Sequence, residues 1–193
     1  MLAASAAEVL AALARVLRRR GVGWYLLGAQ AVIYWGRPRL SADVDVTVRL
    51  PLEEARALAA ALQEEGFHPL VEDLEAFVAR TRVLPLEHRA TGLPVDVVFG
   101  GPGLEEEFLK RAVPVVIGGE TVPVIAPEDL VVTKILAGRA KDIEDVRGIL
   151  AVRGPTLDLD RTRALLALLE KALDRSDLVP ELDRLTGESG FSR

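Results

Sequence analysis

Three aspartates in this chain have a setting that could bind a cation. Asp43 and Asp45 stand two residues apart in an apolar run typical of a strand, and Asp96 has the same apolar surroundings. Side chains two residues apart on a strand point to one face, so this pair shares a face while Val44 and Val46 face the core. Three clustered carboxylates repel one another without a cation. The pattern therefore predicts a Mg²⁺ site, since Mg²⁺ prefers oxygen ligands and adds water and substrate phosphates to its shell.

The apolar patterns around these acids predict an α/β fold in which helices and strands alternate. Pro51 suits the first turn of a helix that ends at Gly66. Two pairs of apolar runs separated by turn residues predict antiparallel hairpins. The expected helices cover residues 5–20, 29–35, 51–66, 105–111 and most of the chain from 127 onward, the strands 24–27, 43–50 and 67–71, and the hairpins 82–99 and 113–125.

The length of 193 residues suits one domain with a small helical appendage. Gly154 and Pro155 form the best boundary, because this pair of residues interrupts the helical pattern. We therefore expect an α/β domain over residues 1–153 and a helical C-terminal extension over residues 154–193.

Composition excludes several classes of site. The absence of cysteine excludes disulfides and zinc–thiolate sites, and two histidines are too few for a histidine-rich metal site. The net charge of −5 indicates no strongly basic nucleic-acid surface overall. No apolar run is long enough to span a membrane, and the arginines at 18–20 follow the first apolar helix rather than precede it as in a secretory signal. We expect a cytoplasmic protein with no membrane partner.

Four segments resemble the nucleotidyltransferase-fold superfamily, the fold of DNA polymerase beta-like enzymes and minimal nucleotidyltransferases. They are YLLGAQA, GRPRLSA, DVDV and the later APEDLVVTKILAGRAKDIEDV, in which a lysine-bearing helix precedes a Lys-Asp-x-x-Asp run. The pattern looks closest to the AbiEii-type toxin and related groups. The resemblance covers residues 24–150 and implies a mixed sheet flanked by helices, with further helices at the C-terminus.

The resemblance also implies roles for individual residues. The three aspartates would hold one or two Mg²⁺ ions, with Mn²⁺ as a substitute, and would be the catalytic residues. A glycine at a helix N-terminus would let the backbone approach phosphates, and basic side chains would contact the triphosphate. The residues expected to bind nucleotide are Gly28, Ala29, Gln30, Arg37, Arg39, Ser41 and Lys134.

Some of these residues have a simpler interpretation, and two depart from the family pattern. Ala29 replaces the second glycine, which narrows the room for a phosphate, and Gln30 either supplies a polar contact or blocks the site. Arg37 and Arg39 also fit solvated loop charges, and Lys134 fits a lysine that reaches the surface from an apolar helix. Lys141 and Asp145 have the spacing of an i, i+4 ion pair.

Three functions remain open at this point. The first is a metal-dependent transfer of a nucleoside monophosphate from an NTP to a hydroxyl of tRNA, a protein or a small molecule. A toxin that pairs with an antitoxin protein belongs to this class of function. The second is an inactive nucleotide- or metal-binding module of the same fold. The third is an interaction subunit that binds a partner through its terminal helices. Three intact aspartates favour the first function over the third.

Overall fold

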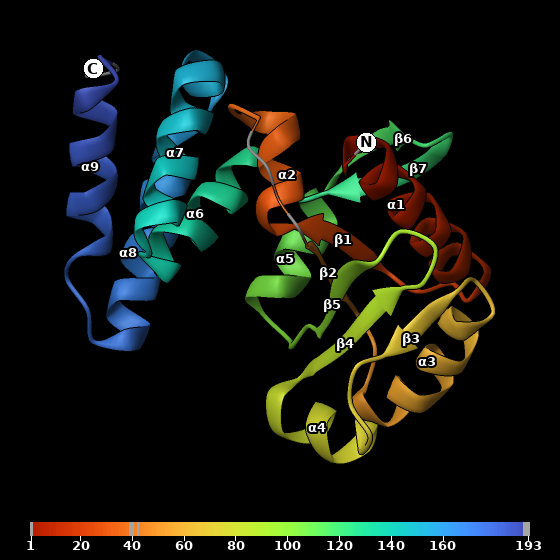
Figure 1. Ribbon diagram of the computed structural model, residues 1–193. Coiled ribbons are helices and arrows are strands. Elements are labelled where there is room, and N and C mark those ends of the chain that lie inside the picture. The colour runs from red at the N-terminus through yellow and green to blue at the C-terminus, as the bar shows by residue number, and fades with distance from the viewer. Residues whose placement is uncertain (1, 39–40, 42, 191–193) are drawn as a thin grey trace. The chain divides into compact units, whose positions relative to one another are not determined.

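A computed structural model describes residues 2–38, 41 and 43–190. By contacts, the chain forms two compact units. Unit 1 comprises Met1–Gln30 and Leu40–Ile125, and unit 2 comprises Ala31–Arg39 and Ala126–Arg193. Figure 1 shows the elements of both units along the chain. The boundary expected between an α/β domain ending at residue 153 and a helical extension starting at residue 154 stays a prediction.

Unit 1 is built on a seven-stranded mixed sheet in the order β3-β4-β5-β2-β1-β7-β6. The pairs β2·β5 and β1·β7 are parallel, and the other four neighbouring pairs are antiparallel. This confirms the expected α/β fold class. The strands are β1 (Trp24–Leu27), β2 (Val44–Val48), β3 (Phe67–Pro69), β4 (Val83–His88), β5 (Leu93–Phe99), β6 (Val113–Ile117) and β7 (Glu120–Val124).

Helix α1 (Leu2–Arg19) packs against β5, β6 and β7, and α3 (Ala55–Gln63) packs against β3. Figure 1 shows these two helices beside the sheet. Val9, Leu13 and Leu17 of α1 are almost fully buried because they recur at helical spacing on one face. Val44 and Val46 are also fully buried, as the alternation along the strand predicts. One face of the sheet is therefore the hydrophobic core of unit 1.

The opposite face of the central strands carries polar groups. Tyr25 and Thr47 pair across β1 and β2, and Tyr25 makes an edge-on contact with Phe108 of α5 (Leu104–Arg111). Farther along the same face lies Asp45, opposite Leu27. Helix α5 thus packs beside one end of this face, and the acids lie toward the other end.

Both predicted hairpins are confirmed, as strands β4 and β5 and strands β6 and β7. Gly118 and Gly119 both have positive φ, which a two-residue hairpin turn that matches the strand twist requires. The expected helix at 51–66 is split into a 3₁₀ turn (Leu52–Glu54) followed by α3. The helix α4 (Leu74–Thr81) was not expected; Asp73 caps it by accepting a hydrogen bond from the Ala76 amide.

Unit 2 contains the later part of α2 (Gly28–Trp35) and four C-terminal helices. These are α6 (Pro127–Ala137), α7 (Ala140–Arg153), α8 (Leu159–Leu173) and α9 (Leu178–Glu188). The other three helices all contact α6. The guanidinium of Arg153 stacks 5.2 Å from the centre of the Trp35 ring, which ties α7 to the end of α2.

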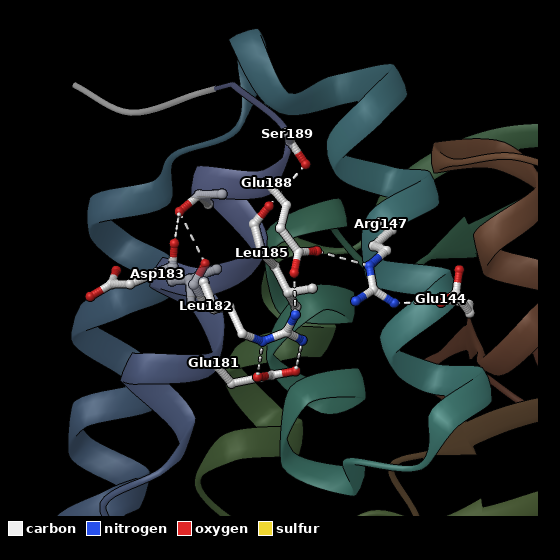
Figure 2. A network of polar contacts seen from close by, with 10 residues as sticks. Glu144, Arg147, Glu181, Leu182, Asp183, Leu185, Glu188 and Ser189 are labelled. Atoms are coloured by element: carbon white, nitrogen blue, oxygen red, sulfur yellow. Dashed lines mark hydrogen bonds and ion pairs between the residues drawn. The ribbon is translucent and has the colours of Figure 1, made fainter.

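A network of ion pairs joins α7 to α9 on the surface of unit 2 (Figure 2). Arg147 of α7 contacts Glu188 of α9 at 3.1 Å and also pairs with Glu144 on its own helix. Arg184 pairs with Glu181 and Glu188. Helix α9 lies in the C-terminal segment expected to be helical, and both this network and its buried leucines support it.

Candidate functional site

Asp45 and Asp96 lie side by side on neighbouring parallel strands. The register of β2 and β5 pairs Asp45 directly with Asp96. Adjacent strands are about 4.8 Å apart, so two register partners on one face place their carboxylates next to each other. The expected gathering of these two acids is confirmed by the pairing of the strands.

Asp43 comes one residue before β2 and is exposed. Its charge reaches Asp96: the pKa of Asp96 is raised above its usual value, first by partial burial and second by the negative charge of Asp43. Asp96 is exposed, so water screens both effects. The three predicted acids thus belong to one electrostatic cluster in unit 1.

Gly28 lies against the carboxylate of Asp45. Its φ of +68° belongs to the left-handed region that favours glycine. A Cβ added there would stand only 2.8 Å from Asp45 Cγ, and nearer still to Oδ2. The carboxylate of Asp45 therefore accounts for the need for glycine at position 28. Contact between the Gly28 backbone and a nucleotide stays a prediction.

The side chains of Gln30 and Ser41 both reach Asp43. Gln30 is only 6% exposed, and its Nε2 donates to the Asp43 carbonyl oxygen at 3.3 Å. The Ser41 hydroxyl donates to Asp43 Oδ1 at 2.5 Å and lies 3.4 Å from the same carbonyl oxygen. Ala29 is also buried. The sequence singled out all three residues as nucleotide contacts, but no feature of it predicted that two of them would hold Asp43.

Lys134 belongs to unit 2, and its ammonium is buried between two carboxylates. Its Nζ lies 3.0 Å from Asp142 Oδ1 and 2.8 Å from Asp145 Oδ2, and these three side chains are at most 8% exposed. Asp145 therefore pairs with a lysine on a different helix from the one expected. The Lys-Asp-x-x-Asp spacing was the signal for this cluster, since it places both aspartates on one face of α7.

Burial and hydrogen bonding act in opposite directions on Asp142. Burial alone would raise the pKa of its carboxyl, but hydrogen bonds from Arg139 and Lys134 outweigh it and leave the pKa below its usual value. Arg139 Nε lies 2.5 Å from Asp142 Oδ2. Asp142 is thus held ionised inside unit 2, and the contact of Lys134 with phosphate stays a prediction.

The two remaining candidates are arginines of the loop before the acids. Arg37 is exposed in unit 2 and packs beside Gly148 of α7. Arg39 lies outside the described residues. Contact of either arginine with a triphosphate stays a prediction.

The acids of the cluster meet only part of what a protein site for a divalent ion usually offers. In the described parts of the chain, no group of three or more His, Cys, Asp or Glu side chains is arranged so that it could hold a metal ion. The chemistry of the acids nevertheless fits Mg²⁺, because they offer only oxygen atoms and Mg²⁺ usually takes one or two carboxylates plus water and phosphate. The adjacent pair Asp45 and Asp96 matches that requirement.

A groove of about 560 Å³ lies at the carboxyl ends of β2 and β5, where Arg49 and Gly100 line it. The carboxylates lie near the other end of β2 and do not line this groove.

No helix within the described residues has the length and apolar character needed to cross a bilayer.

Residues 6–176 match the model of a protein family described as "Nucleotidyl transferase of unknown function (DUF2204)". No curated protein is significantly similar to the chain. Several solved structures are similar in fold.

One is an antigenic nucleotidyltransferase-like protein from Paracoccidioides brasiliensis, with 21% identity, a TM-score of 0.56 and coverage of 92% of this chain and 91% of that one. A second is the antibiotic-resistance factor ANT(2'')-Ia, with 16% identity, a TM-score of 0.59 and coverage of 90% and 97%. A third is the lincosamide antibiotic adenylyltransferase LnuA, in its lincomycin-bound form, with 14% identity, a TM-score of 0.50 and coverage of 72% and 92%. At these identities the likeness shows the fold alone.

Proposed function

The chain belongs to the nucleotidyl transferase family whose model matches it, and we propose that it is an enzyme that moves a nucleoside monophosphate from an NTP to a hydroxyl acceptor with the help of Mg²⁺. The observation that carries this proposal is the register pairing of Asp45 with Asp96, with Asp43 close enough to affect the charge state of Asp96. In the proposed reaction, the acceptor oxygen forms a bond to the α-phosphorus, the bond from that phosphorus to the bridging oxygen breaks, and pyrophosphate leaves.

The three aspartates would have different roles at this site. Asp43 and Asp45 would hold the cation, and Asp96 would help to hold it and accept the proton of the attacking hydroxyl. Bound Mg²⁺ would neutralise phosphate charge and orient the triphosphate for in-line displacement. The proposed nucleotide contacts are Gly28, Ala29, Arg37, Arg39, Ser41 and Lys134.

The acceptor is proposed by class. The net charge of −5 disfavours extended contact with RNA, because phosphate binding relies on many basic side chains. Among similar folds, one structure holds adenylyl-2''-tobramycin and another holds lincomycin. We therefore propose that the acceptor is a small hydroxyl-bearing molecule rather than tRNA or a protein. The resemblance to AbiEii-type toxins supports a finer proposal, that the chain is a toxin with an antitoxin partner in the cytoplasm.

The alternative is an inactive nucleotide- or metal-binding module. Ala29 and Gln30 favour it, because each is larger than the residue of the family pattern at its position and both are buried. An interaction subunit is the third possibility, and it needs no metal.

Calorimetric titration of each NTP, with and without Mg²⁺, separates the interaction subunit from the two nucleotide-binding possibilities, and an assay of pyrophosphate release then separates the enzyme from the inactive module. The proteins are wild type, Asp43→Asn and the control Asp174→Asn, whose aspartate is exposed at the left-handed end of α8. Mg²⁺-dependent binding by wild type and the control, lost in Asp43→Asn, supports the enzyme. Absence of NTP binding by wild type contradicts it and favours the interaction subunit.

A further inference from the structure

Asp43 differs from the other two acids in what holds it in place. Asp45 and Asp96 are paired residues of the central sheet, so their positions follow from strand register. The pairing of β2 with β5 starts at Val44, one residue after Asp43. The position of Asp43 therefore depends on side-chain contacts rather than on the ladder of backbone hydrogen bonds.

Gln30 supplies one of these contacts from inside the protein. Its side chain is almost fully buried, and a buried amide is costly unless it is hydrogen-bonded. The Nε2 donates to the main-chain carbonyl of Asp43, thirteen residues later in the chain. An apolar side chain would fill the same space without this cost, so the value of a glutamine here lies in the contact it makes.

Ser41 makes a complementary contact from the loop. Its hydroxyl donates to Asp43 Oδ1 and so sets the rotation of the carboxylate, whereas Gln30 sets the position of the main chain. Two donors thus act on the backbone and on the side chain of one acid. Hydrogen bonds to a ligand residue of this kind orient it for metal binding.

We propose that Gln30 is a positioning residue that holds the main chain of Asp43 so that its carboxylate faces the site shared with Asp45 and Asp96. This inference rests on the proposed function for the role of Asp43 as a metal ligand, but the contact itself does not. Gln30 accordingly acts through Asp43 rather than through the nucleotide.

The test removes the donor and keeps the length of the side chain. Gln30→Met is compared with wild type, with Asp43→Asn, and with Thr162→Val, which deletes another buried donor to a backbone carbonyl, that of Asp158 in unit 2. Amide hydrogen exchange over residues 43–48 reports the position of Asp43 without any metal. Calorimetric titration with Mn²⁺ reports the metal site. Gln30→Asn, which stays polar but is too short to reach the carbonyl, replaces Gln30→Met if that variant does not fold.

Faster exchange over residues 43–48 in Gln30→Met, with Mn²⁺ affinity reduced about tenfold or more and Thr162→Val unchanged, is the expected result. Exchange equal to wild type overturns the inference, whatever happens to Mn²⁺ affinity. Faster exchange in the variant combined with no Asp43-dependent Mn²⁺ binding in wild type supports the contact and contradicts the proposed function. The two failures are therefore distinguishable.

Discussion

The carboxylate of Asp45 occupies the space beside Gly28 in which any other residue would carry its Cβ. Leu27, the residue before Gly28, pairs with Asp45 across β1 and β2, so the start of α2 and the acid are brought together by strand register. Gly28 and Asp45 therefore depend on each other, because a side chain at position 28 would collide with the carboxylate at position 45.

Gly28→Ala should displace Asp45 and destabilise unit 1. A left-handed alanine costs about 1 kcal/mol, and the collision with Asp45 adds roughly 1–3 kcal/mol. Gly21→Ala is the matched control, because Gly21 has a φ of +64° and open space around its Cβ position. Urea unfolding of both variants measures the difference. Equal losses in the free energy of unfolding would show that Asp45 does not constrain Gly28.

Removing charge from the acid cluster should reduce activity without reducing stability. Asp96→Asn is expected to lower the rate of nucleotide transfer about a hundredfold or more if Asp96 accepts the proton. Its melting temperature without metal should equal or exceed that of wild type, because a repelled carboxylate is removed. Thermal unfolding in EDTA and an assay of pyrophosphate release check the two parts. A strongly lowered melting temperature would assign Asp96 to folding instead.

Asp43→Ala and Asp45→Ala should each abolish Mg²⁺-dependent transfer while the circular dichroism spectrum stays unchanged. The physical reason is that the cation loses a carboxylate ligand in a set of only three. Pyrophosphate release at increasing Mg²⁺ concentration is the measurement. Wild-type activity in both variants would contradict the proposed mechanism.

Lys134→Met should destabilise unit 2 strongly. It leaves the buried carboxylates of Asp142 and Asp145 without their shared cation, and breaking a buried pair in this way typically costs about 3–5 kcal/mol. Lys110→Met removes an exposed lysine that pairs with Glu107, and its cost should be much smaller, because water screens this surface pair. Chemical denaturation compares them. A small effect of Lys134→Met would indicate that this lysine is kept for ligand binding rather than for stability.

The pH dependence of unfolding should reveal Asp142. Its pKa is lower in the folded protein, so its carboxylate contributes stability above the unfolded value of about 3.9 and loses it as the pH falls through the folded value. The free energy of unfolding of wild type should therefore fall more steeply below about pH 4 than that of Asp142→Asn. Denaturation curves between pH 7 and pH 3 test this expectation. Parallel pH profiles would show that Asp142 has the same affinity for protons in both states.

Patterns of apolar residues were sufficient to predict most elements of the sheet, because alternation and turn residues act locally. They predicted β1, both hairpins and the acid-bearing strand, and they placed Asp45 and Asp96 on strands correctly. Asp43 was expected on the same strand as Asp45, but β2 begins one residue after it. The missed helix α4 begins after an aspartate cap and buries Val78 alone, so its apolar periodicity is weak. The C-terminal α9 lies in the segment expected to be helical, and the packing of its leucines and the ion pair with α7 support it.

The sequence by itself determined the kinds of side chain available for chemistry and the family to which they point. Tertiary structure alone decided their partners: Asp45 beside Asp96 and Gly28, Gln30 on the carbonyl of Asp43, and Lys134 between two aspartates. The physical reason is that local spacing specifies the face of a strand or helix on which a side chain lies. The residue it meets across that face depends on strand order, register and packing between segments far apart in the chain.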